Sequence, residues 1–178
     1  MGIAGWMLAA AAFAAVVAAE KPCPAMVDAD LTGNKWDASY ASKLRVPGVG
    51  RGTDTTSGAV TFASDGTFAA TEDDDGVPRT YTGTWKLRNG GTELKARLDA
   101  NGKAELRRAI ATWISETTGA RRVRLQFTRA SFRVAQVPAT AGAFTMKLAS
   151  AGTGSGVVGG RRVSATFTHS STISLTPQ

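Results

Sequence analysis

Cysteine and histidine are scarce in this chain, which has one of each among its 178 residues. A disulfide needs two thiols, so Cys23 cannot form an intramolecular disulfide bond. Structural zinc sites use several Cys or His ligands, and a lone cysteine with a lone histidine, His169, argues against such a site. The chain is long enough to fold on a hydrophobic core alone, and we expect that it does.

Motifs for catalysis and for phosphate or calcium binding are lacking as well. The sequence has no G-x-S-x-G elbow, and the Gly-rich residues 152–160, expected to form a loop, lack the Lys-Ser/Thr ending of a phosphate loop. The carboxylates of residues 72–75 do not have EF-hand spacing, and we expect a solvated hairpin loop there. His169 has no evident partner and is expected at an exposed strand end. We predict no enzymatic activity, no catalytic residue, no metal site and no cofactor.

Charged side chains are missing from residues 1–19, an Ala-rich apolar segment. It ends in small residues before Glu20, which is typical of a cleaved secretory signal. We predict cleavage after Ala19 and a secreted, periplasmic or cell-surface protein without a transmembrane span; retention of the segment as an anchor is the alternative. Pro22 and Glu20 do not fit the lipoprotein pattern before Cys23.

Alternating apolar and polar residues dominate the rest of the chain. Residues 20–32 are interpreted as an N-terminal linker, and residues 33–178 as one domain. Alternation over residues 35–46 predicts a half-buried strand, followed by a flexible loop at residues 47–52. Two hairpins are predicted with turns at Asp65-Gly66 and Asn89-Gly90, because these pairs readily adopt positive φ.

A helical period replaces the alternation in one segment. Leu106, Ile110, Trp113 and Ile114 form one apolar stripe, which predicts an amphipathic helix at 103–116. Asp99 or Asn101 can cap its start, and Gly119 can end it. Strand patterns then resume. The inward parity is odd at Leu125 and even at Phe132, and we predict a β-bulge or bend within residues 128–131.

These patterns predict a mainly β fold: an antiparallel β-barrel or sandwich of about eight strands with one amphipathic α-helix. The hairpins, together with residues 62–68 and Gly83-Thr84-Trp85, resemble those of bacterial lipocalin-like (calycin-type) secreted barrels. The Gly-x-Trp spacing of that family is matched at residues 83–85, whereas the first strand has one residue more, at 33–36. The resemblance implies that a small apolar or amphipathic molecule binds inside the barrel.

Large and small residues alternate along the inward faces of the predicted strands. The large ones are the candidate ligand-binding residues Trp36, Tyr40, Phe62, Phe68 and Trp85. Small inward residues such as Ala70 and Gly83 leave space either for a ligand or for the docked helix, and both alternatives remain open at this point.

Positive charge is in excess, with a formal net charge of +7. Much of it lies in the C-terminal half, and an exposed strand face can carry Arg122, Arg124, Arg129 and Arg133. The alternative function is therefore an envelope structural or interaction module that binds anionic polymer or lipid through these arginines. Nucleic acid is not an expected partner, because the aromatic residues that would stack on bases are assigned to the core.

Overall fold

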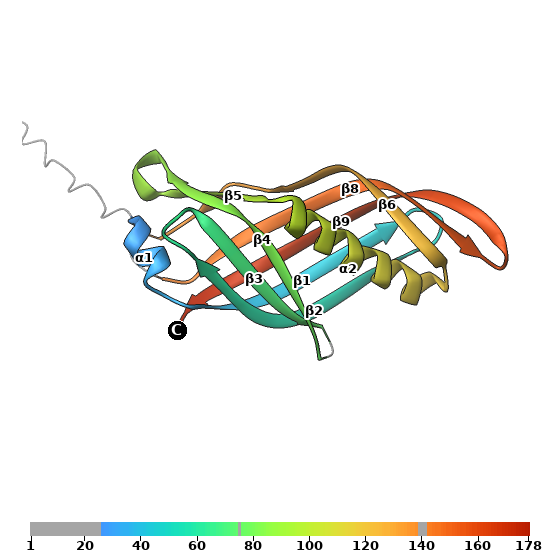
Figure 1. The fold of residues 1–178 in the computed structure, drawn as a ribbon, viewed down its shortest axis with the longest axis horizontal. Coiled ribbons are helices and arrows are strands. Elements are labelled where there is room, and N and C mark those ends of the chain that lie inside the picture. The colour runs from blue at the N-terminus through green and yellow to red at the C-terminus, as the bar shows by residue number, and fades with distance from the viewer. Residues whose placement is uncertain (1–25, 75, 139–141) are drawn as a thin grey trace, which may run out of the picture.

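The computed structural model describes residues 26–74, 76–138 and 142–178 (Figure 1). The predicted signal peptide at residues 1–19, Cys23 and the first part of the predicted linker lie outside the described residues. Export of the protein therefore stays a prediction.

Nine antiparallel strands form one sheet, in the order β6-β8-β9-β1-β2-β3-β4-β5-β7. The strands are β1 (Trp36–Val46), β2 (Gly50–Phe62), β3 (Thr67–Asp74), β4 (Val77–Arg88), β5 (Glu93–Leu98), β6 (Arg121–Phe132), β7 (Ala135–Gln136), β8 (Phe144–Val158) and β9 (Arg161–Pro177). The helices are α1 (Asp28–Thr32), the short 3-10 turn η1 (Asn89–Gly91) and α2 (Ala100–Thr118).

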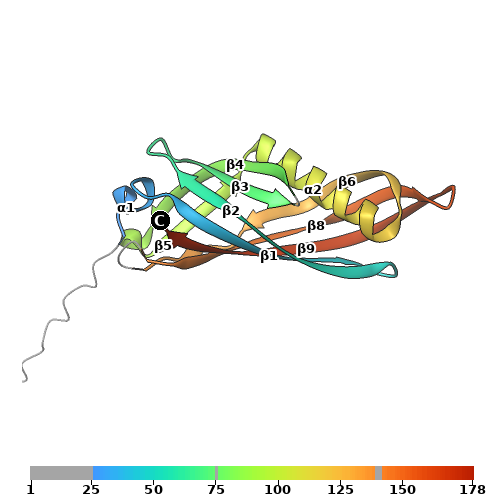
Figure 2. The ribbon, with the colours of Figure 1, turned by 90° about the horizontal axis from the view of Figure 1, so that it is seen from below.

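The sheet curls into a half-barrel, and α2 packs on its concave side (Figure 1 and Figure 2). This confirms the predicted mainly antiparallel β fold with one principal helix, with nine strands in place of about eight. The curled single sheet is consistent with a lipocalin-like architecture and is not a two-sheet sandwich.

Both predicted hairpin turns are present. Gly66, between β2 and β3, has a φ of 82°, and Asp65 accepts hydrogen bonds from the backbone N–H and the hydroxyl of Thr67 at 2.9 and 2.6 Å. Between β4 and β5, Asn89 and Gly90 have φ values of 49° and 65°. Glycine and asparagine adopt this left-handed conformation with little strain, which explains their place in the two turns.

The ends of α2 follow the predicted capping residues, although the helix is longer than residues 103–116. The Asp99 side chain accepts a hydrogen bond from the backbone N–H of Gly102 at 2.7 Å. Gly119 ends the helix in the left-handed conformation, and its N–H donates to the Ser115 carbonyl at 2.8 Å. Both contacts satisfy backbone groups that a helix end leaves unpaired.

The strand β6 contains the predicted bulge. Its register with β8 shifts between Phe127 and Arg129, so Leu125 and Phe132 both contact the core despite their different parity. Inward residues of β6 have odd numbers before this shift and even numbers after it. Arg124, before the shift, and Arg129, after it, therefore both lie on the outer face of the sheet.

The predicted Gly-rich loop is mostly strand, so that prediction is wrong, and a second predicted loop is shorter than expected. The strand β8 continues through the Gly-rich segment to Val158, and only Gly159 and Gly160 make the turn. Glycine is required at position 152, since a Cβ atom there would lie 2.0 Å from the backbone oxygen of Gln126 on β6. Likewise, the predicted flexible loop at residues 47–52 shrinks to a turn, because β2 already begins at Gly50.

The described part of the predicted linker belongs to the folded core. Met26, before α1, is 1% exposed, and Leu31, on α1, is 0% exposed. The Leu31 carbonyl accepts a hydrogen bond from Trp36 Nε1 at 3.1 Å. These contacts close one end of the half-barrel. Among the described residues, no helix has the length and apolar character needed to cross a bilayer.

Candidate functional site

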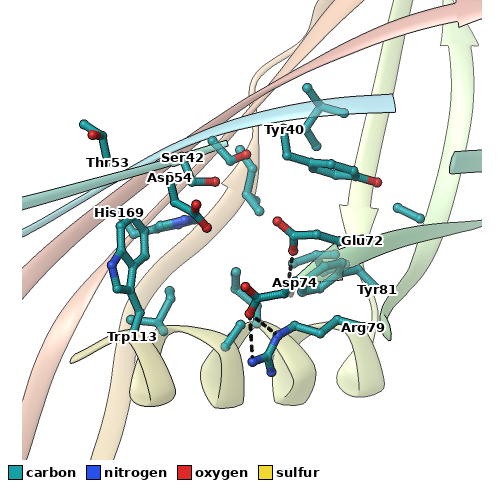
Figure 3. Close-up of a pocket in the computed structure, with 18 of the residues that line it drawn as sticks. Tyr40, Ser42, Thr53, Asp54, Glu72, Asp74, Arg79, Tyr81, Trp113 and His169 are labelled. Atoms are coloured by element: carbon teal, nitrogen blue, oxygen red, sulfur yellow. Dashed lines mark hydrogen bonds and ion pairs between the residues drawn. The ribbon is translucent and has the colours of Figure 1, made fainter. Parts of the chain in front are cut away.

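A cavity of about 240 Å³ lies between α2 and the concave face of the sheet (Figure 3). A water needs only about 10–15 Å³ of such space, so this cavity is large enough for several waters or one small organic molecule. The apolar lining residues come from both α2 and the sheet: Leu98, Leu106, Ile110, Phe132, Leu148 and Ile173. The remaining lining residues are mostly polar, so the cavity is amphipathic.

A carboxylate held by two hydroxyl groups lies in the polar wall. Tyr81 Oη donates to Glu72 Oε2 and Thr56 Oγ1 donates to Glu72 Oε1, each at 2.6 Å. The pKa of both Tyr81 and Tyr40 is raised above the ordinary tyrosine value, mainly by burial and further by the negative charge of Glu72. Both phenols therefore stay protonated, and Tyr40 Oη donates to the Thr71 carbonyl at 2.8 Å.

Arg79 is neutralised by two carboxylates. Its Nη2 lies 3.1 Å from Asp74 Oδ2, and its Nη1 lies 3.7 Å from Glu105 Oε1 on α2. Glu72 and Asp74 belong to β3 and line the cavity, so the prediction of a solvated loop is wrong for these two carboxylates, whereas position 75 lies outside the described residues. The period-2 pattern of β3 carries the signal, since Glu72 has the same parity as the buried residues Phe68 and Ala70.

His169 is buried inside the half-barrel, which corrects its prediction as an exposed strand-end residue. It lies within β9, is 7% exposed, and has Nδ1 3.3 Å from Ser150 Oγ. The Trp113 ring of α2 stands edge-on to it, with centroids 6.4 Å apart. Burial lowers the pKa of His169 to about 4, so the imidazole is neutral at physiological pH.

A row of polar side chains crosses three neighbouring strands beside His169. Asp54 of β2 is paired with Ser42 of β1, and Ser42 is paired with Ser171 of β9. Ser171 is 5% exposed, and its Oγ has no hydrogen-bond partner among the described residues. Figure 3 shows Asp54, Ser42 and His169 grouped at one end of the cavity, away from Glu72.

The cavity is negatively charged although the chain as a whole is positive. Its charged lining residues are Asp54, Glu72, Asp74, Glu116 and Arg79. Asp54 and Glu116 are exposed and mark the side that opens to solvent. The Asp54 carboxylate accepts a hydrogen bond from the Thr55 N–H at 2.8 Å, and no ion pair to it occurs within the described part of the chain.

No family model matches this sequence, and no curated protein matches it either. The site is therefore interpreted from its own geometry. Within the described ranges, no group of three or more His, Cys, Asp or Glu side chains is arranged to hold a metal ion.

Of the five aromatic residues predicted to bind a ligand, the structure places Tyr40 on the cavity. The other four, Trp36, Phe62, Phe68 and Trp85, pack against one another or against Phe144 in an aromatic cluster outside it. Ring centroids in this cluster are 5.1 to 6.4 Å apart, the spacing of well-packed aromatic pairs. Their role in ligand binding stays a prediction.

The four predicted arginines are all exposed and lie on or directly after β6. Arg124 and Arg129 are on the outer face of the sheet, and Arg133 follows, with its N–H bonded to the Lys147 carbonyl at 2.8 Å. Arg122 has a φ of 55° within a second register shift of β6. None of the four lines the cavity under α2.

The sequence interpretation missed Ser42, Asp54, Ser171 and Trp113 as cavity residues. A usable signal was present for the two serines, since each occupies an inward position between large buried residues of its strand. Polar residues at inward positions of a strand need either an internal partner or a ligand.

Proposed function

We propose that the protein is an exported, non-enzymatic binding protein that takes one small amphipathic molecule carrying an amine into the cavity under α2. The observation that carries the proposal is the polar row of Asp54, Ser42 and Ser171 in a cavity of about 240 Å³ that apolar side chains, including Leu106 and Ile110 of α2, also line. Binding pockets for small molecules combine an apolar lining with a few placed polar groups in this way.

The polar row favours a ligand that donates hydrogen bonds and carries positive charge. A buried hydroxyl without a partner costs about 1–3 kcal/mol, and a bound polar group would recover this for Ser171. The Asp54 carboxylate has no cation beside it in the described structure and would pair with an ammonium group. Leu106, Ile110 and Ile173 would contact the apolar part of the ligand.

The state of His169 supports binding rather than catalysis. A general base works best when its pKa lies near the working pH. Burial holds the pKa of His169 at about 4, and its polar neighbour is the hydroxyl of Ser150. The imidazole therefore serves as a neutral polar group of the cavity wall in this proposal.

Calorimetric titration with phenethylamine tests the proposal, with phenethyl alcohol and phenylacetate as analogues of similar size. We expect the ammonium compound to bind at least about tenfold more tightly than either analogue, because a hydrogen bond to a charged group contributes about 1.5–3 kcal/mol. Asp54→Asn should remove this preference. Asp28→Asn, an exposed carboxylate outside the cavity, is the matched control and should keep it.

A second pair of variants tests whether the ligand enters the cavity. Ala109 lines it, whereas Ala104, five residues earlier on α2, does not. Ala109→Phe should fill the space and abolish binding, whereas Ala104→Phe should leave the dissociation constant within about twofold. Equal affinity for all three compounds, or undiminished binding by Ala109→Phe, would overturn the proposal.

A further inference from the structure

A second, independent site lies on the convex face of the sheet, opposite α2. A groove of about 630 Å³ runs there between two sets of cationic side chains. One wall consists of Lys43, Arg45 and Arg51 on β1 and β2, and the other of Arg129 and Arg133 at β6. We call these five residues the cationic groove.

The strand register explains how the two walls arise. Arg51 is paired with Arg45, Arg45 with Thr168, Thr168 with Ala151, and Ala151 with Arg129. This row crosses five strands spaced about 4.8 Å apart, so the Cα atoms of its outer arginines are separated by roughly 19 Å. The bulge in β6 matters here, because without it Arg129 would point to the concave side.

The floor between the walls is made of small residues. Outward positions of β9 carry hydroxyl groups almost without interruption, at Ser164, Thr166, Thr168, Ser170 and Thr172. Of these residues, Thr168 and Ser170 line the groove, together with Ala149 of the neighbouring β8. The groove is therefore open along the strand direction and offers hydroxyl hydrogen bonds between two rows of positive charge.

The cations of this groove are not neutralised internally. The ion pairs of the described residues are made by Arg79 and Arg108, and none involves a residue of the cationic groove. Asp37 is a carboxylate on the same face of β1, but it lies six residues from Lys43 and forms no ion pair in the described structure. Its Oδ1 accepts a hydrogen bond from the side-chain amide of Gln178 at 2.6 Å. A patch of this kind attracts anions strongly at low salt.

We propose that the cationic groove binds a linear acidic polysaccharide that lies along β8 and β9. Two walls of charge with a narrow polar floor fit a chain rather than a flat membrane surface, and the floor offers no large apolar side chain for insertion into lipid. Nucleic acid fits less well, because no aromatic residue is among the large apolar side chains exposed in the described structure, and base stacking needs one.

The test is calorimetric titration of the full chain with heparin, a linear sulfated polysaccharide, over a series of salt concentrations. We expect heparin affinity to fall with salt, and the double variant Arg45→Gln/Arg129→Gln, with one change in each wall, to weaken it by at least about tenfold. The same change of charge made elsewhere, as Arg88→Gln/Arg97→Gln, is the matched control. It lies in a separate basic cluster of β4 and β5, where Arg97 and Arg88 lower the pKa of Lys95.

A change in the floor distinguishes the groove from general charge attraction. Thr168→Glu places a carboxylate between the walls and should abolish heparin binding, whereas Thr176→Glu, on the same face of β9 but eight residues away, should not. Circular dichroism of each variant checks that it remains folded. Equal losses in the two double variants would show attraction by net charge alone. That result, or tighter binding of anionic lipid vesicles or single-stranded DNA than of heparin, would overturn the proposal.

Discussion

The stability of the protein should fall as the pH is lowered from about 6.5 to about 4, because His169 is neutral in the folded state. Its pKa is lowered by burial from 6.5 to about 4. Above pH 6.5 the folded and unfolded chains both carry the neutral imidazole. Below that pH the unfolded chain binds a proton that the folded chain does not, so unfolding becomes more favourable. The loss is complete once the folded state also binds the proton, near pH 4.

The expected loss from about pH 7.5 to about pH 5 is about 2 kcal/mol for this one group, from the two pKa values and the linkage relation. Urea unfolding at both pH values measures it. Carboxylates also titrate near the lower pH, so the quantity to compare is the difference between the native chain and His169→Gln. The variant should lose about 2 kcal/mol less than the native chain over this range.

The sole histidine also allows a direct measurement. Its imidazole proton resonance, followed by NMR with pH, should titrate near pH 4 in the folded protein. Titration near the ordinary histidine value, or the same pH dependence of stability in His169→Gln, would show that the imidazole is hydrated and that our assignment of a buried neutral group is wrong.

Two further predictions concern the fold. Gly152→Ala should destabilise the protein by about 2 kcal/mol or more, since its Cβ would meet the Gln126 backbone oxygen at 2.0 Å, whereas Gly50→Ala, with open space around it, should change the free energy of unfolding little. Asp99→Ala should cost about 1 kcal/mol through loss of the helix cap, and Asn101→Ala, which lies inside the helix, less than about half of that. Thermal and urea unfolding measure both pairs, and equal effects within a pair would contradict the structural explanation.

Local chemistry made much of the fold predictable. The Asp65-Gly66 and Asn89-Gly90 turns and the Asp99 cap depend on residues a few positions apart, so their geometry can be inferred from the chain itself. The bulge in β6 could also be predicted from the sequence. The inward positions of a strand cannot change from odd to even numbers without an extra residue.

The candidate site was much less predictable. The sequence predicts a loop at Glu72 and an exposed strand end at His169, because polar residues are usually solvated, and both predictions are wrong. Their burial depends on partners distant in the chain, such as Tyr81 for Glu72 and Ser150 for His169. Likewise, a glycine-rich sequence predicts a loop, whereas the close approach of the Gln126 backbone explains the glycine at position 152 of β8.

The amino-acid sequence is sufficient to predict the strand periods, the tight turns, the capped helix and the excess of positive charge, since each depends on neighbouring residues or on composition. By contrast, the folded sheet brings Asp54, Ser42 and Ser171 into one polar row and places Arg45 and Arg129 on opposite sides of a groove. Strand order and register bring together residues far apart in the chain, and no local preference encodes that pairing.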